Sequence, residues 1–172
     1  PTFEKIGNQN ADFRVGLTST LTYKTLTFYM LWDWKQGGDI YNRNAQWNTI
    51  AKRNVIVDQA GKPADQKKTV SYYESLYDTN NNNGFWVEDG SFVKLREVSL
   101  SYNVPTEWIQ NIGFFEDIKV SLIGRNLLTF SDYKGWDPEV LSYDGSTQQY
   151  FSVDYGVYPI QRSYSLSVQF KF

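Results

Sequence analysis

The chain has 172 residues and a formal net charge of −2, so it is long enough for a domain with a core and lacks the positive charge that neutralises nucleic-acid phosphates. It contains no cysteine and no histidine, which excludes disulfides, thiolate chemistry and the commonest general base and transition-metal ligand. Aromatic residues make up 17% of the chain on a background rich in polar residues. This mixture is typical of strands with one apolar and one polar face, in a membrane barrel or in a soluble β-sandwich.

Two neighbouring strands are predicted near the N-terminus. Between residues 12 and 23, mostly apolar side chains at odd positions alternate with polar ones at even positions. Between residues 26 and 34 the even positions are apolar, whereas Tyr29 and Leu31 make the other face mixed. A period of two places alternate side chains on opposite faces of a strand. Only Lys24 and Thr25 separate the two segments, which predicts a tight turn.

The next two strands are predicted at about residues 91–104 and 118–130. In the first, Val98, Leu100, Tyr102 and Val104 share one phase, but residues 93 and 95 are apolar in the opposite phase. We therefore expect a bulge near residues 96–97 or a change of environment. Between the two strands, residues 106–112 are predicted to form a turn of helix, capped by its first residue and stopped by Gly113.

The most regular alternation lies at the C-terminus. From residue 160 to Phe172 the even positions are apolar, with Arg162 as the exception, and the odd positions are polar. Ten such residues match a tilted strand that crosses a bilayer as part of a barrel. We expect the barrel-assembly machinery to read this final strand through its apolar residues Tyr164, Leu166, Val168, Phe170 and Phe172.

The connections alternate between short and long, as in membrane barrels with brief periplasmic turns and extended extracellular loops. Five strands cannot close a barrel in lipid, because bacterial barrels have an even count of at least about eight strands and open edges would leave backbone groups unsatisfied. The missing strands are therefore expected from an N-terminal part of the same polypeptide. A soluble or surface-anchored β-sheet binding module, without transport activity, is the alternative.

Most of the chain resembles the C-terminal region of the SusC/RagA family of TonB-dependent outer-membrane transporters of Bacteroidetes. The resemblance rests on residues 85–105 (FWVEDGSFVKLREVSLSYNVP), 122–140 (LIGRNLLTFSDYKGWDPEV) and 158–172 (YPIQRSYSLSVQFKF). Residues 11–42 resemble the strand pair that precedes these segments.

This resemblance implies an all-β fold in which residues 1–172 supply about five C-terminal strands of an antiparallel barrel of about 22 strands. It implies active import of oligosaccharides or oligopeptides across the outer membrane, with long loops extracellular and the C-terminus periplasmic. The expected partners are the plug and the rest of the barrel, a SusD-like surface lipoprotein, TonB with ExbB and ExbD, and the lipid bilayer. We expect no nucleic-acid partner.

The residues offer no strong catalytic or metal site. The paired carboxylates Glu88 and Asp89 lie in loop-like sequence, and without histidine or cysteine no Ser–His or Cys–His system can form, so we expect no enzyme. We expect no cofactor, although Asp137, Glu139 and Asp144 could hold a loop calcium ion.

Other aromatic and charged residues can be interpreted as binding residues or as structural ones. Candidate extracellular contacts to substrate or to the lipoprotein lid are Trp47, Trp86, Tyr133 and Trp136, with packing inside the loops or an aromatic girdle as the alternative. Trp32 and Trp34 are read as girdle residues. Charges on polar or mixed strand faces, which are read as the normal lining of a barrel interior, are Arg96, Lys119 and Arg125.

Overall fold

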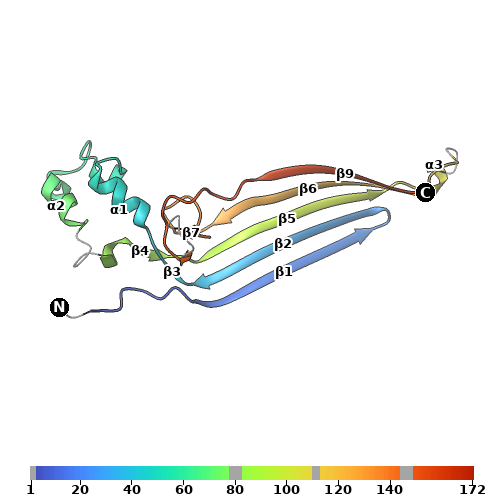
Figure 1. The fold of residues 1–172 in the computed structure, drawn as a ribbon. Coiled ribbons are helices and arrows are strands. Elements are labelled where there is room, and N and C mark those ends of the chain that lie inside the picture. Colours follow the sequence, from blue (N-terminus) through green and yellow to red (C-terminus); the bar gives the residue numbers. More distant parts are fainter. Residues whose placement is uncertain (1–2, 78–82, 110–112, 144–148) are drawn as a thin grey trace. The chain divides into compact units, whose positions relative to one another are not determined.

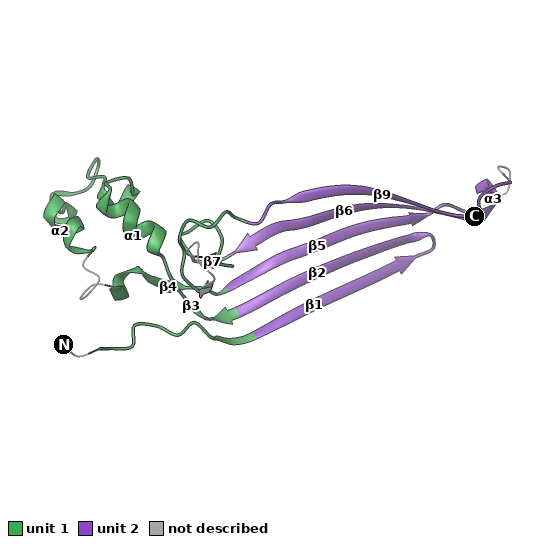
Figure 2. Ribbon diagram, viewed as in Figure 1, with its two compact units in different colours: residues 1–13, 36–91, 131–159 green, residues 14–35, 92–130, 160–172 purple. Residues whose placement is uncertain are grey.

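The computed structural model describes residues 3–77, 83–109, 113–143 and 149–172. It divides into two compact units, which are coloured separately in Figure 2. The loop unit comprises residues 1–13, 36–91 and 131–159, and the sheet unit comprises residues 14–35, 92–130 and 160–172. Each unit is described by itself.

The sheet unit contains the five strands that the sequence predicts (Figure 1). They lie in the order β1-β2-β5-β6-β9, so each long strand is a neighbour of the next one along the chain. The pairings of β2 with β5, β5 with β6 and β6 with β9 are antiparallel. The strand bounds are β1 Ala11–Tyr23, β2 Leu26–Gly37, β5 Phe92–Asn103, β6 Asp117–Phe130 and β9 Ser163–Lys171.

The predicted bulge lies in β5 at Arg96. Leu31 pairs with Glu97, whereas the next residue of β2, Trp32, pairs with Leu95, so Arg96 is an extra residue in β5. The ladder between β5 and β6 shifts at the same place. An extra residue reverses the alternation, and residues 93 and 95 therefore return to the face that carries residues 98, 100 and 102. The prediction of a bulge is confirmed.

The last strand is shorter than its alternation suggests. Its ladder with β6 runs from Lys171, opposite Asp117, to Ser163, opposite Arg125. The next residue of β6, Asn126, has a positive φ of 53°, which leaves the extended conformation needed for pairing. Its side-chain amide instead donates to the Gln161 carbonyl oxygen at 3.2 Å. Residues 160–162, including the exceptional Arg162, therefore lie outside the strand.

Paired positions divide the sheet into an apolar and a polar face. Across three strands, Leu100 pairs with Leu122, and Leu122 pairs with Leu166. One position along, Ser101 pairs with Ser121, which pairs with Ser167, and the first two hydroxyls lie 2.8 Å apart. Side chains of paired residues point to the same side of a sheet. The alternation in the sequence therefore becomes two continuous surfaces.

The turns of the sheet unit agree in part with the predictions. Lys24 and Thr25 connect β1 to β2, and Lys24 adopts a positive φ of 52°. After Pro105, the helix α3 (Thr106–Ile109) occupies the start of the predicted helical turn. Residues 110–112 lie outside the described residues. Gly113 has a φ of 69°, which a glycine adopts without steric cost.

The loop unit has secondary structure that the alternation does not reveal. In residues 39–89 the elements are β3 (Asp39–Tyr41), α1 (Arg43–Ile50), the 3₁₀ turns η1 (Val55–Val57) and η2 (Ala64–Gln66), α2 (Val70–Ser75), η3 (Asn83–Trp86) and β4 (Val87–Asp89). β3 and β4 form an antiparallel pair, as do β7 (Leu141–Tyr143) and β8 (Gln149–Phe151).

A small core holds the helices of the loop unit together. It consists of the buried side chains of Tyr73, Leu76 and Trp86, with Tyr41 and Ile56 among the residues packed against it. Polar caps fix the start of each helix: Asn42 accepts a hydrogen bond from the Ala45 N–H of α1, and Thr69 accepts one from the Tyr72 N–H of α2.

Candidate functional site

A charged cluster lies on the polar face of β1, β2 and β5. Asp33 accepts hydrogen bonds from Arg14, at 2.9 Å from Nε and 2.6 Å from Nη2, and from Arg96, at 2.9 and 2.5 Å from the same atoms. Bidentate hydrogen bonds of this kind fix the orientation of the guanidinium and the carboxylate. Because Arg96 is the bulge residue, the same irregularity that aligns the apolar face also brings this guanidinium to Asp33.

The cations of this cluster surround an aromatic ring. The Phe92 ring is 3% exposed, with Arg14, Arg96 and Lys94 at 5.9, 5.6 and 5.1 Å from its centroid. These distances are within the range of cation–π attraction. Further along the same face, Arg125 donates to Glu97 at 2.8 Å, and Lys119 lies opposite Asn103 and Gln169. The charges predicted on polar or mixed faces are thus placed on the polar face of the sheet.

Aromatic residues gather where the last strand ends. The Phe172 ring lies 5.2 Å from Phe114 and 5.3 Å from Phe115, and Phe115 also lies 5.1 Å from Phe170. The Glu116 N–H donates to the Lys171 carbonyl at 2.7 Å, and the two side chains form an ion pair. The hydrogen bond from Lys171 lowers the pKa of the Glu116 carboxyl. The terminal residue is therefore anchored to the segment that precedes β6, and its role in assembly stays a prediction.

Two of the four candidate loop aromatics are buried. Trp86 is 3% exposed, and its ring N–H donates to the Leu76 carbonyl at 2.8 Å. Tyr133 donates to Asp154 Oδ2 at 2.6 Å. Burial, and then the hydrogen bond to Asp154, raise the pKa of the Tyr133 phenol well above its usual value. Both positions favour the packing alternative that the sequence left open.

The other two candidate aromatics are accessible. Trp136 is 67% exposed, and its ring lies 6.5 Å from that of Tyr158. Trp47, on α1, is 40% exposed and makes an edge contact with Tyr155 at 5.3 Å. Their role as contacts to substrate or to a lipoprotein stays a prediction.

The loop carboxylates have structural uses. Glu88 accepts from the Asn42 side chain at 3.0 Å and from the Lys134 N–H at 2.8 Å, and Asp89 accepts from the N–H and hydroxyl of Ser91. The described residues contain no group of three side chains suited to a metal ion. Asp144, a member of the predicted calcium site, lies outside the described residues, so this site stays a prediction.

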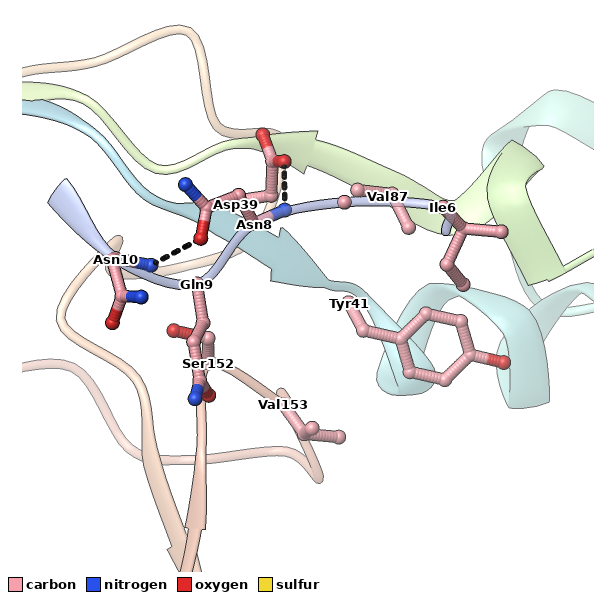
Figure 3. A pocket seen from close by; sticks show the side chains of 10 residues that line it. Ile6, Asn8, Gln9, Asn10, Asp39, Tyr41, Val87, Ser152 and Val153 are labelled. Carbon is pink, nitrogen blue, oxygen red and sulfur yellow. Dashed lines mark hydrogen bonds between the residues drawn. The ribbon is translucent and has the colours of Figure 1, made fainter. Parts of the chain in front are cut away.

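A polar cleft lies in the loop unit (Figure 3). We call it the amide cleft, because its polar lining consists of the three consecutive amide residues 8–10 together with Asp39, Tyr41 and Ser152. Its volume is about 430 Å³. The strand alternation gives no sign of this cleft, although the run of amides at residues 8–10 is a visible signal.

Backbone contacts to β3 build the amide cleft. The Asp39 N–H donates to the Asn8 carbonyl at 2.7 Å, and Asp39 Oδ2 accepts from the Asn8 N–H at 2.6 Å. At the other end of β3, the Tyr41 N–H donates to the Ser152 carbonyl at 2.8 Å, and the Tyr41 carbonyl accepts from Asp154. The cleft therefore lies between two chain segments that both attach to the same strand edge.

Side chains give the amide cleft a mixed surface. Ile6, Val87 and Val153 add apolar atoms to its lining. The Tyr41 hydroxyl donates to Gln46 Oε1 at 2.7 Å, and Gln46 does not line the cleft. The Tyr41 hydroxyl is thus bonded to Gln46, and Figure 3 shows Tyr41 among the residues that line the cleft. The arrangement can contact a ligand that has both apolar and hydrogen-bonding groups.

Curated relatives are found among TonB-dependent receptors of Formosa agariphila, whereas no family model matches the sequence. The chain is 27% identical to TonB-dependent receptor P3 and 29% identical to TonB-dependent receptor P26, in each case over 97% of its length. It spans 17% and 18%, respectively, of the length of these relatives. None of the helices in the described ranges is long and apolar enough to cross a bilayer.

Solved structures of the RagAB peptide importer share the fold. The "open-open" state matches with a TM-score of 0.69 and 20% identity over 95% of this chain, and the "closed-closed" state with 0.68 and 21% over 92%. Both matches cover 17% of the solved chain, so the five-stranded sheet is a segment of a larger antiparallel β-barrel. The comparisons confirm the resemblance of this chain to the C-terminal barrel region of SusC/RagA-type TonB-dependent receptors.

Proposed function

We propose that this chain is part of the barrel wall of an outer-membrane importer that takes up oligosaccharides or oligopeptides. The observation that carries the proposal is the apolar face of the sheet, where large side chains remain accessible along the strands. Leu122 is 59% exposed, Leu166 67% and Phe170 51%. A contiguous accessible surface of this kind indicates contact with a membrane or another protein. In a bilayer, these side chains would lie against lipid.

The opposite face has the chemistry of a water-filled lumen. Ser101, Ser121 and Ser167 line it, and the Asp33 cluster supplies paired charges. Polar inner and apolar outer faces that alternate along each strand are the pattern of transmembrane barrels. With the C-terminus in the periplasm, the connections between β2 and β5 and between β6 and β9 are extracellular. Trp32 and Trp34 then lie toward the outer girdle.

The partners of the importer follow from the family that this chain resembles. A SusD-like lipoprotein would meet the extracellular loops, and TonB with ExbB and ExbD would supply energy through a plug outside this chain. The barrel-assembly machinery would read the strand that ends at Phe172. The relation to a complex named as a peptide importer supports peptides among the possible substrates.

Cell fractionation of the source organism tests the location and the fold together. We expect the full-length protein in the outer-membrane fraction, with a gel mobility that changes on heating because folded barrels resist detergent. Deletion of its gene should remove uptake of at least one fluorescently labelled oligosaccharide or oligopeptide. Recovery in the aqueous phase, without heat-modifiable mobility, would contradict the proposal and favour a soluble binding module.

A further inference from the structure

We propose that the amide cleft binds neutral, hydroxyl-rich sugar residues of an oligosaccharide. The inference rests on the proposed import function and deepens it by naming a class of substrate and a place of contact. Three properties of the cleft carry it: the charge of its lining, the unused hydrogen-bonding capacity of its side chains, and the occupied edge of β3.

The charge of the lining argues against acidic ligands. Among the ten residues that line the cleft, Asp39 carries the only charge, and no lysine or arginine contributes. A uronate, a sulfated sugar or a peptide carboxylate would meet a carboxylate of the same sign without a compensating cation. Like charges placed together disfavour binding. Neutral ligands avoid this cost.

The side chains of the lining offer both donors and acceptors. In the described part of the chain, the side-chain amides of Gln9 and Asn10 make no hydrogen bond, and Asn8 uses only its oxygen, which accepts from the Asn10 N–H at 3.2 Å. Each amide can donate through its nitrogen and accept through its oxygen. A sugar hydroxyl also donates and accepts, so three adjacent amides match a row of hydroxyl groups.

The occupied edge of β3 argues against a peptide. Extended peptides bind by adding a strand to a free sheet edge, through backbone hydrogen bonds. Here the Asp39 N–H is bonded to Asn8, the Tyr41 N–H to Ser152, and the Tyr41 carbonyl to Asp154. These backbone groups of β3 are therefore not free to pair with an added peptide strand. Recognition must come from side chains, which suits hydroxyl groups.

The size and walls of the cleft fit a sugar. Its volume of about 430 Å³ lies within the range of small-ligand sites, at about 300–1,000 Å³. Apolar atoms of Tyr41, Ile6 and Val87 lie among the polar groups. A pyranose ring has C–H groups on its faces and hydroxyls around its rim, so it can use both kinds of surface at once.

Binding by the full-length protein in detergent tests the inference. Calorimetry would use four probes of matched length: a neutral β-glucan and a neutral mannan oligosaccharide, an alginate oligosaccharide, and an uncharged peptide. The variants are Gln9→Ala, Asn10→Ala and their combination. Gln66→Ala is the matched control, because Gln66 is an exposed amide of the same unit that does not line the cleft.

We expect a neutral oligosaccharide to bind, with Kd rising about threefold to tenfold for each alanine variant, since each loses one or two hydrogen bonds. The Gln66→Ala variant should bind like the wild type. Unchanged affinity in the double variant would overturn the inference, as would binding of only the alginate or the peptide, or of no probe. These outcomes differ from failure of the import proposal, which is decided by the location and uptake of the wild-type protein.

Discussion

The sheet unit and the loop unit are stabilised by different interactions. In the sheet unit, backbone ladders join neighbouring strands, and many large apolar side chains on one face remain accessible, with Tyr164 77% exposed. In the loop unit, the elements are short, and specific contacts hold them: the core at Trp86, the buried bond between Tyr133 and Asp154, and the links from Glu88 to Asn42 and Lys134.

This difference reflects two physical requirements, one for a wall in lipid and one for loops in water. A membrane wall can leave apolar side chains uncovered, because lipid solvates them while the ladders satisfy the backbone. Loops in water must bury apolar groups among themselves and pair each buried polar group. Different substitutions should therefore destabilise the two units. We expect a charge on the apolar face to destabilise the sheet, and loss of side-chain volume or of a single hydrogen bond to destabilise the loops.

The largest effect is expected for Trp86→Ala in the loop core. Removing a buried Trp side chain costs about 3–5 kcal/mol, and the Leu76 carbonyl also loses its donor. Peptides from residues 43–77 should exchange hydrogen faster and be cut sooner by protease, while heat-modifiable mobility of the barrel is unchanged. Trp136→Ala, at a site 67% exposed, is the control. Loss of the folded barrel in Trp86→Ala would show that the two units do not follow separate rules.

Leu166→Lys tests the apolar face of the sheet. Leu166 lies in the middle of β9, opposite Leu122, and a lysine at the bilayer midplane costs about 2–4 kcal/mol. The free energy of unfolding in lipid vesicles, from denaturant titration, should fall by this amount. Ser165→Lys places the same charge on the neighbouring position of the polar face and should cost little. Equal costs for both variants would argue that the apolar face does not meet lipid.

Tyr133→Phe tests the dependence of the loops on single hydrogen bonds. The change leaves Asp154 Oδ2 without its buried donor, which should cost about 1–3 kcal/mol locally. Protease cleavage within residues 131–159 should become faster. A cleavage rate equal to that of the wild type would show that this bond does not hold the loop.

Tyr133 also predicts a loss of loop stability at alkaline pH, whereas acid denaturation, caused mostly by protonation of carboxylates, occurs at low pH. The pKa of Tyr133 is raised in the folded loop, so above about pH 10 the unfolded state loses a proton that the folded state keeps. The stability of the loop unit should therefore fall as the pH rises above about 10. Absorbance of tyrosinate should show one late-titrating group in the wild type that is missing in Tyr133→Phe. Normal titration of every tyrosine would contradict this.

A modest change in stability is expected at the chain end. Deleting Phe172 removes its ring contacts with Phe114 and Phe115, each worth about 0.5–1.5 kcal/mol. Phe115→Ala loses the same contact from the other side but leaves the terminal residue in place. If assembly reads the terminus, folded barrel in the membrane should fall much more for the deletion than for Phe115→Ala. Equal yields would assign the effect to packing alone.

Local alternation was sufficient to predict the strands, because a period of two depends only on neighbouring residues. The five segments, the tight turn at Lys24 and the bulge near Arg96 all follow from this periodicity. The mixed second strand is explained by pairing: Leu31 lies opposite Glu97, and Tyr29 lies opposite Ser99, on the polar face. β9 starts three residues later than the alternation predicts, because the positive φ that interrupts the pairing belongs to Asn126 of the neighbouring strand.

The loop structure depends on contacts between residues far apart in the sequence. Helix α1 has buried Gln46 and Thr49 rather than an apolar stripe, so no helical period marks it. The burial of Tyr133 depends on Asp154, 21 residues away, and the salt bridges of Asp33 join three strands. The amide cleft forms only when residues 8–10 and Ser152 meet β3. Composition identifies such residues as loop residues but cannot say which ones come together.

The extra residue Arg96 changes which residues of β5 face the apolar side of the sheet. Before Arg96, odd-numbered residues face the apolar side, and after it even-numbered residues do. The apolar and polar residues of the two halves therefore alternate in opposite phase. If the bulge were lost and Arg96 entered the regular pairing, Val93 and Leu95 would lie on the same side as Ser99 and Ser101 without any other change in the sequence. A single insertion or deletion elsewhere in β5 would therefore turn part of the strand to the wrong face. Deletion of Arg96 would instead leave both halves on their present faces and remove only the guanidinium that binds Asp33.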